Sequence, residues 1–227
     1  MSDEKLLVGG FVSLTSVDYP GSLAFVVFLQ GCPWRCRYCH NRHLQTVSPA
    51  EALPWEDVLN LIKARTGFID AVVFSGGEPL MQNALPESIQ QVKALGLKVG
   101  LHTGGALPEN LARVADLVDW VGFDVKHTFE KYALITNISE SGEKAFESLK
   151  ILIDHKVNFE ARMTLDLIIP TEDILKIMHQ LSEMGVKNAV LQKCRDKNGD
   201  DEEHPIFSDK KALDELSKIF ENFLVRA

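Results

Sequence analysis

The sequence predicts an α/β fold in which six parallel strands alternate with outer helices. Short apolar runs rich in β-branched residues alternate with longer amphipathic stretches along the chain. Each apolar run ends at glycine or polar residues, as strands do where they enter a loop. The length of 227 residues suits one large domain, so residues 1–227 are expected to fold together.

The elements follow one another in strand–helix order. The expected strands are the apolar runs 23–29, 71–74, 97–101, 117–125, 157–165 and 186–192. The expected helices are the amphipathic stretches 54–65, 84–95, 108–115, 142–154, 171–184 and about 208–225. Pro54 occupies a tolerated first-turn position, and Thr171 and Ser208 are expected N-caps followed by acidic residues.

Strands that alternate with helices pair in parallel through right-handed crossovers, in either an open doubly wound sheet or part of a barrel. Both arrangements place function at the carboxyl ends of the strands. The polar and glycine-rich segments lie at these carboxyl ends, namely residues 31–41, 75–79, 102–105, 124–126 and 192–196. We therefore expect one shared active face, whereas the polar segment 193–207 is expected to be a solvated surface loop.

Composition narrows the class of protein. The 32 acidic and 24 basic side chains give a net charge of −8, which argues against nucleic-acid binding. No apolar run reaches the ~20 residues that a membrane helix needs, and the N-terminus does not resemble a secretory signal. A cytoplasmic protein is expected, with its four cysteines reduced and available for chemistry.

Three of the cysteines, Cys32, Cys36 and Cys39, lie in the expected loop 31–41 with C-x3-C-x2-C spacing. Three thiolates can hold an iron–sulfur cubane and leave one of its irons open to a small molecule. A zinc site completed by His40 or His43, a C-x-x-C-H haem attachment and three buried core cysteines are the alternatives. Spacing alone favours the open cluster and leaves the others standing. The fourth cysteine, Cys194, is expected in a pocket wall or in the core.

Two motifs in order make the chain resemble the radical S-adenosylmethionine superfamily. The first is the cysteine pattern with aromatic Tyr38 before Cys39, and the second is the glycine–glycine–glutamate segment 75–79 after the next strand. Further similarity to activating proteins of glycyl-radical enzymes lies in the segments 9–11, 17–21, 30–32 and 38–41. The nearest subgroup activates anaerobic ribonucleoside-triphosphate reductase. The resemblance implies a partial (β/α)6 barrel of the radical SAM type.

The resemblance also implies two cofactors, a [4Fe–4S] cluster held by the three cysteines and S-adenosylmethionine chelated to the open iron. Gly76 and Gly77 would let the backbone approach the methionine end of the cofactor, since they carry no side chain. Glu78 would accept a charge-assisted hydrogen bond from its amino group. Tyr38 offers an aromatic face for adenine, and His40 would shape the same wall.

Similar activating enzymes carry an Asp-x-Lys segment at the end of the fourth expected strand, 117–125, which corresponds here to Asp124, Val125 and Lys126. These residues are therefore expected near the carboxylate and ribose of the cofactor. Lys126 could neutralise the carboxylate, and Asp124 could bind a hydroxyl or a monovalent cation. A plain surface charge at a strand end is the alternative for each.

His102 and Thr103 stand where relatives usually carry Asp-Thr, so this chain departs from the pattern. Neutral imidazole is a poor ligand for a sodium-like ion, which puts a cation site in doubt. Arg162 is a charge inside an apolar strand pattern. It is expected either in an ion pair within the barrel or on the cofactor carboxylate.

The implied reaction is reductive cleavage of S-adenosylmethionine to a 5′-deoxyadenosyl radical that takes a hydrogen atom from a partner's glycine. The implied partner is a glycyl-radical enzyme, anaerobic ribonucleotide reductase first, and the implied electron donor is a reduced flavodoxin or ferredoxin. Activation of pyruvate formate-lyase or of another glycyl-radical enzyme is the alternative within the family. A zinc-binding or electron-transfer module is the alternative from another class.

Overall fold

The computed structural model describes residues 5–195 and 200–226. Its strands are β1 Val8–Thr15, β2 Ala24–Leu29, β3 Ala71–Gly76, β4 Lys98–Thr103, β5 Trp120–Val125, β6 Phe159–Leu165, β7 Asn188–Arg195, β8 Asp201–Glu202 and β9 Asn222–Arg226. Its α-helices are α1 Trp55–Ala64, α2 Leu85–Lys93, α3 Pro108–Val114, α4 Ala133–Thr136, α5 Ser141–Asp154, α6 Thr171–Glu183 and α7 Lys210–Ile219. No helix within this described part is long and apolar enough to cross a bilayer.

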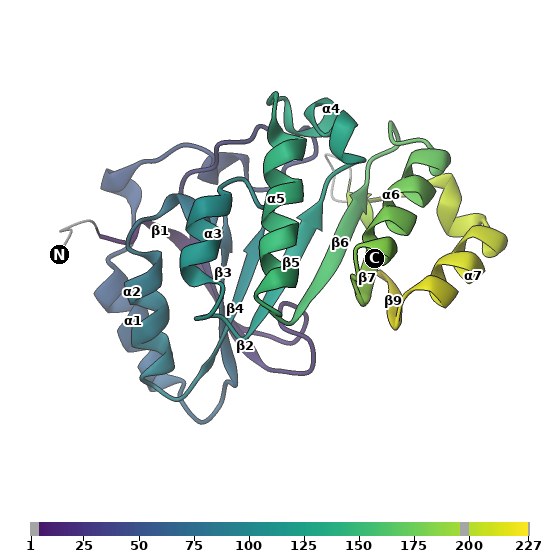
Figure 1. Ribbon diagram of the computed structural model, residues 1–227. Helices are drawn as coiled ribbons and strands as arrows, with labels where there is room; N and C mark the ends of the chain where they lie inside the picture. Colours follow the sequence, from purple (N-terminus) through teal and green to yellow (C-terminus); the bar gives the residue numbers. More distant parts are fainter. Residues whose placement is uncertain (1–4, 196–199, 227) are drawn as a thin grey trace.

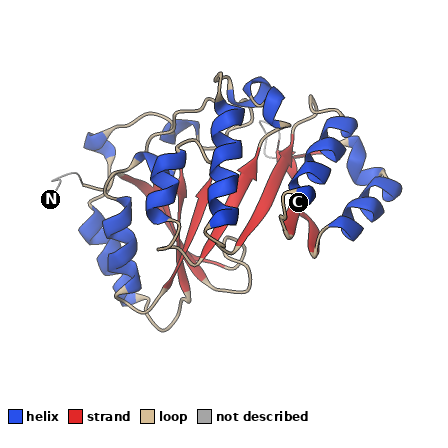
Figure 2. Ribbon diagram, in the orientation of Figure 1, coloured by secondary structure: helices blue, strands red, loops and turns tan. Residues whose placement is uncertain are grey.

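Strands β2 to β7 are parallel and adjacent in chain order, which confirms the predicted α/β class. Figure 1 shows the connecting helices along one side of these strands, and Figure 2 separates the two layers by colour. β1 pairs antiparallel with β2 at one end of the sheet, and β9 pairs parallel with β7 at the other. Within the described residues the two ends do not pair with each other, so the barrel is partial, as predicted.

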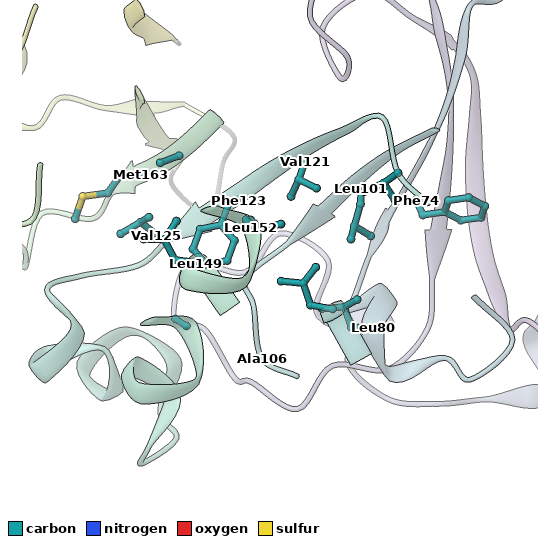
Figure 3. Packing of buried hydrophobic residues seen from close by; sticks show 14 of the residues in the cluster. Phe74, Leu80, Leu101, Ala106, Val121, Phe123, Val125, Leu149, Leu152 and Met163 are labelled. Carbon is teal, nitrogen blue, oxygen red and sulfur yellow. The ribbon is translucent and has the colours of Figure 1, made fainter. Parts of the chain in front are cut away.

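The two faces of the sheet bury different cores because successive strand residues point to opposite sides. Phe25, Val27 and Leu29 of β2 belong to the large cluster under the helices. Figure 3 shows part of this cluster, with Phe123 of β5 beside Leu149 and Leu152 of α5. The concave face carries a small cluster that includes Ala24, Val26, Tyr19 and Trp120. Polar residues can therefore occupy the concave face further along the strands.

The prediction of a C-terminal helix over about 208–225 is wrong beyond Ile219. Helix α7 ends there, Phe220 is extended, and residues 222–226 form β9. Ser208 is not the cap, because the Asp209 carboxylate accepts from the N–H groups of Lys211 and Ala212 at 3.1 and 3.0 Å. The helical pattern of the Phe and Leu residues misled the prediction, since a partly exposed strand with an aromatic residue looks similar.

The expected N-cap at Thr171 is also wrong, because Thr171 is the first residue of α6 and Pro170 occupies the cap position. Two segments differ from expectation as well. β1 was not predicted, because its Gly-Gly start and its exposed residues give no clear strand pattern. The polar segment 193–207 is more ordered than a solvated loop: β7 runs through Arg195 and pairs with β8, while residues 196–199 lie outside the described part. The buried His204 ties this segment to the turn between β6 and α6, with its Nε2 2.7 Å from the carbonyl oxygen of Ile169.

Candidate active site

The carboxyl ends of β2 to β6 surround a cavity of about 220 Å³ on the concave face. All but one of the residues predicted for the site line it, namely Cys32, Cys36, Tyr38, Cys39, His40, Gly76, Gly77, Glu78, His102, Thr103, Asp124, Lys126 and Arg162. The exception is Val125, which is fully buried in the core under the helices. The parallel sheet thus brings together segments that are far apart in the sequence.

Five lining residues were not among the predicted site residues, namely Trp34, Asn41, Ser75, Gly104 and Thr164. Thr164 lies two positions after Arg162 on β6, and the period of two along a strand could have identified it. Gly104 lies in a glycine-rich strand end, and it allows the Trp34 ring to pack closely. A Cβ at Gly104 would come within 2.4 Å of that ring.

The cysteine loop supplies three free thiols to one cavity, each of them partly buried. Burial, with the nearby Glu78 charge, raises the pKa of Cys32 to about 12. Burial also raises the pKa of Cys36, against the opposing effect of Lys126. A metal centre that binds these sulfurs as thiolates must displace their protons. Across the described residues, no three His, Cys, Asp or Glu side chains converge closely enough to hold a single metal ion.

Gly76 and Gly77 allow the end of β3 to lie against the start of the cysteine loop. Gly76 has φ +112°, and a Cβ there would lie 2.4 Å from the backbone nitrogen of Leu29. A Cβ at Gly77 would lie 2.2 Å from the carbonyl oxygen of Gly31. Both glycines are therefore required by contact between protein backbones, whatever their role toward a cofactor.

Glu78 is buried and joins the ends of β3 and β4. Its Oε1 accepts from the Thr103 hydroxyl at 2.7 Å and from the Leu80 N–H at 3.3 Å, and its Oε2 accepts from the Gly104 N–H at 3.1 Å. Burial raises the pKa of Glu78 to about 7, although these donors oppose the rise. Oε2 keeps a lone pair for a further donor, because a carboxylate oxygen can accept two hydrogen bonds.

Asp124, Lys126 and Arg162 form a charged network in the cavity wall. Arg162 contacts the Asp124 carboxylate at 2.8 Å and Lys126 contacts it at 3.2 Å, so Arg162 is ion-paired within the barrel. Burial would raise the pKa of Asp124, but the two cations outweigh it and hold that pKa below its usual range. The Arg162 guanidinium lies over Gly122, where a Cβ would come within 2.5 Å of it. The network has one more cation than anion.

His102 is neutral in this setting. Burial, and then the Arg162 charge, lower the pKa of His102 to about 3. Its Nε2 lies 2.9 Å from the carbonyl oxygen of Asp18, so Nε2 carries the proton and donates. This contact ties the turn after β1 to the cavity.

The donor set fits a cluster with S-adenosylmethionine. Three thiols meet an acceptor at Glu78 and a cation at Lys126, which suit an amino group and a carboxylate. The buried Tyr38 hydroxyl has no hydrogen-bond partner within the described chain, and the Lys126 Nζ lies 5.6 Å from the centre of its ring. An unsatisfied buried hydroxyl at a cavity wall calls for a ligand or a water.

A second cavity of about 550 Å³ lies behind the cysteine loop. Tyr38, Cys39 and His40 line both cavities, and Arg37 reaches the Asp166 carboxylate across the second one at 2.8 Å. Cys194 is buried in its wall, one of the two positions predicted for it.

Fold and site together define the class of protein. It is a partial parallel α/β barrel in which a cysteine loop and a glycine–glutamate strand end line the same cavity. The family model of the radical SAM superfamily matches residues 26–181. The chain therefore belongs to the radical SAM superfamily. Members of this family use a [4Fe–4S] cluster and S-adenosylmethionine.

Curated relatives extend the similarity to the whole chain. A Methanocaldococcus jannaschii protein, named as a candidate glycyl-radical enzyme activating enzyme, is 32% identical over 97% of this chain and 94% of its own length. The pyruvate formate-lyase-activating enzyme of Clostridium pasteurianum is 32% identical over 64% of this chain and 66% of its own length. These relatives place the chain among the activating enzymes of glycyl-radical enzymes.

Solved structures share the fold at low sequence identity. QueE from Escherichia coli has a TM-score of 0.59 at 18% identity, over 98% of this chain and 94% of that one. Streptococcus suis SuiB bound to S-adenosylmethionine has a TM-score of 0.67 at 11% identity, over 86% of this chain and 45% of that one. The chain thus spans less than half the length of SuiB.

Proposed function

We propose that this protein activates anaerobic ribonucleoside-triphosphate reductase by generating a radical on one of its glycines. The observation that carries the proposal is the single cavity that unites the three cysteines with Gly76–Glu78, Asp124, Lys126 and Arg162. The bound cluster and S-adenosylmethionine would supply a 5′-deoxyadenosyl radical by one-electron cleavage of the sulfonium. The residues of the chain would bind, orient and shield the reacting groups.

Each side of the cofactor has a proposed partner in the cavity. The thiolates of Cys32, Cys36 and Cys39 hold the cluster. Oε2 of Glu78 accepts from the methionine amino group, and Lys126 neutralises the carboxylate. The face of Tyr38 and the neighbouring His40 lie against adenine.

The neutral His102, with Thr103 and Arg162, completes the wall toward the ribose. Because His102 already donates to Asp18 and carries no negative charge, we propose no sodium-like ion at this position. The backbone of Val125 serves only to place Asp124 and Lys126, since its own side chain is in the core.

The partner is proposed from the motifs shared with activating proteins of anaerobic ribonucleotide reductase. The open side of the partial barrel suits a protein substrate, because a glycine on a partner must reach a cavity on the concave face. Reduced flavodoxin or ferredoxin in the cytoplasm is the proposed electron donor. Pyruvate formate-lyase is the second candidate partner, favoured by the relatives that activate it.

The first test is anaerobic reconstitution with iron and sulfide. We expect about four irons per chain and a broad band near ~400 nm, with 5′-deoxyadenosine formed after reduction. Cys36→Ala should lose the cluster and the cleavage while its far-UV circular dichroism is unchanged. Cys194→Ala is the matched control and should keep both. A colourless wild-type protein with one zinc, or cleavage by Cys36→Ala, would overturn the ligand assignment.

The second test identifies the partner. The reduced protein is incubated with S-adenosylmethionine and either anaerobic ribonucleotide reductase or pyruvate formate-lyase, and electron paramagnetic resonance detects the glycyl radical. A signal with the reductase and none with the lyase supports the proposal. The reverse pattern selects the second candidate.

A further inference from the structure

The segment after β5, which includes α4, accepts hydrogen bonds from the cysteine loop. The backbone N–H groups of Arg35 and Arg37 donate to the carbonyls of Thr136 and Ile135, at 2.9 and 3.1 Å. These carbonyls belong to the last turn of α4, where a helix has no internal donors left. Cys36 lies between the two donors, so both of its neighbours are tied to α4. Figure 1 shows α4 beyond the carboxyl ends of β5 and β6, where the candidate cavity lies.

Asn137 adds a third tie from the same segment. It has a left-handed backbone with φ 56°, and its N–H donates to the Ala133 carbonyl to close α4. Its side-chain Nδ2 donates to the carbonyl of Arg35 at 2.7 Å, across 102 positions of sequence. Helix termination accounts for the left-handed backbone, which glycine would adopt equally well. It does not account for the amide contact with the cysteine loop.

The residues at either end of α4, which precedes Asn137, are fixed by contacts with the rest of the fold. Tyr132, just before α4, is 1% exposed, and its ring stacks on that of Phe129 with the ring centroids 5.7 Å apart. The hydroxyl of Thr136 lies 2.7 Å from that of Ser141, at the start of α5. A tie to α4 therefore fixes the cysteine loop to the body of the fold.

The other two cysteines depend on different contacts. The Cys32 N–H donates to the Gln45 carbonyl at 3.2 Å, and the Cys39 N–H donates to the Cys36 carbonyl at 3.1 Å. Cys39 is therefore placed relative to Cys36, and α4 places Cys36. We infer that Asn137 is a positioning residue that holds Cys36 in the orientation required of a cluster ligand. This inference rests on the proposed function, because it gives the thiol a cluster to bind.

The test uses variants that change one property at a time. Asn137→Gly keeps access to the left-handed backbone and removes the amide. Asn137→Asp keeps the shape of the side chain but replaces its donor by an acceptor, opposite the Arg35 carbonyl. Lys156→Gly is the matched control, because Lys156 also has a left-handed backbone, φ 54°. It follows α5 and lies next to residues 157–159, at the amino ends of the strands and away from the cavity.

The first readout needs no cluster. Alkylation of the iron-free protein by iodoacetamide is followed at each cysteine by mass spectrometry, with buried Cys194 as the internal reference. We expect both Asn137 variants to raise the rate at Cys36 relative to Cys194 about three- to tenfold, the range that loss of one hydrogen bond allows. Lys156→Gly should leave the ratio unchanged. An unchanged ratio in both Asn137 variants would overturn the inference.

The second readout uses the reconstituted protein. Iron transfer to an excess of chelator should be faster from both Asn137 variants than from the wild type. The electron paramagnetic resonance spectrum of the reduced cluster should also broaden. Equal transfer rates in wild type and variants would count against the role of Asn137 while leaving the cluster itself established. Failure of the wild type to take up iron would instead refute the proposed function, and the alkylation result would still decide whether Asn137 orients Cys36.

Discussion

Glu78 serves the fold and the candidate site with the same carboxylate. Three donors from β4 and from the turn after β3 hold it in place, and it also lines the cavity. The sequence motif predicted a contact with a cofactor amino group. The structure adds that the same carboxylate joins two strand ends, so a change at Glu78 affects stability as well as binding.

The titration of Glu78 gives a pH-dependent prediction for the iron-free protein. Its folded pKa of about 7 lies above the ordinary value of 4.5, so the folded state holds the proton more tightly than the unfolded state. This contribution to stability is fully present below pH 4.5 and is lost as the pH rises toward 7. Glu78→Gln should therefore flatten the fall of the unfolding free energy between pH 5 and 7, by up to about 1.4 kcal/mol per pH unit.

Urea unfolding at several pH values measures this effect. Gln cannot lose a proton, so the difference in slope between the two proteins isolates Glu78. Exposed Glu87 offers the control, since Glu87→Gln should keep the wild-type slope. Equal slopes in wild type and Glu78→Gln would contradict the raised pKa.

Strand β9 closes one flank of the sheet and depends on a cross-strand ion pair. Arg226 donates from Nη1 and Nη2 to the two Glu160 oxygens at 2.6 and 3.0 Å, in a bidentate arrangement. Glu160 is only 5% exposed, so its carboxylate needs this partner. The pair fixes the end of the chain to β6, across β7.

Arg226→Met should lower the free energy of unfolding by about 2 kcal/mol, because it leaves a buried carboxylate without a cation. The double variant Glu160→Gln/Arg226→Met should recover much of that loss, since no charge is then stranded. Urea denaturation of the three proteins checks both statements. A double variant less stable than the single one would show that the contact matters for packing and not for charge.

At the scale of the whole molecule, one apolar cluster runs beneath the helices from Leu6 to Phe220. A continuous core of this kind unfolds cooperatively. We therefore predict one urea transition with the same midpoint by far-UV circular dichroism and by tryptophan fluorescence. The tryptophans suit the test, since Trp34 lies in the cysteine loop, Trp55 in α1 and Trp120 in β5. Two separate midpoints would contradict the prediction of a single domain over residues 1–227.

Much of the parallel sheet could be predicted, because each central strand is buried on both faces and forms a short apolar run. Strands β2 to β7 lie where those runs predicted them, apart from shifts at their ends. The two flanks were harder. β1 and β9 have exposed residues, such as Leu14 at 49% and Leu224 at 50%, and therefore lack a clear pattern. Edge strands depend on pairing with a neighbour, which local sequence does not record.

The sequence by itself determined which cofactors to expect. The spacing of Cys32, Cys36 and Cys39 favoured an open iron–sulfur cluster, because ligand number and spacing are local properties of the chain, and the resemblance carried by the two ordered motifs implied S-adenosylmethionine. Tertiary structure decided which groups hold those residues in place. The ion pair of Arg162 with Asp124, the neutral state of His102 and the tie from Asn137 to the cysteine loop all join distant segments. Such contacts arise only when the strands are set side by side, so no pattern within one segment could reveal them.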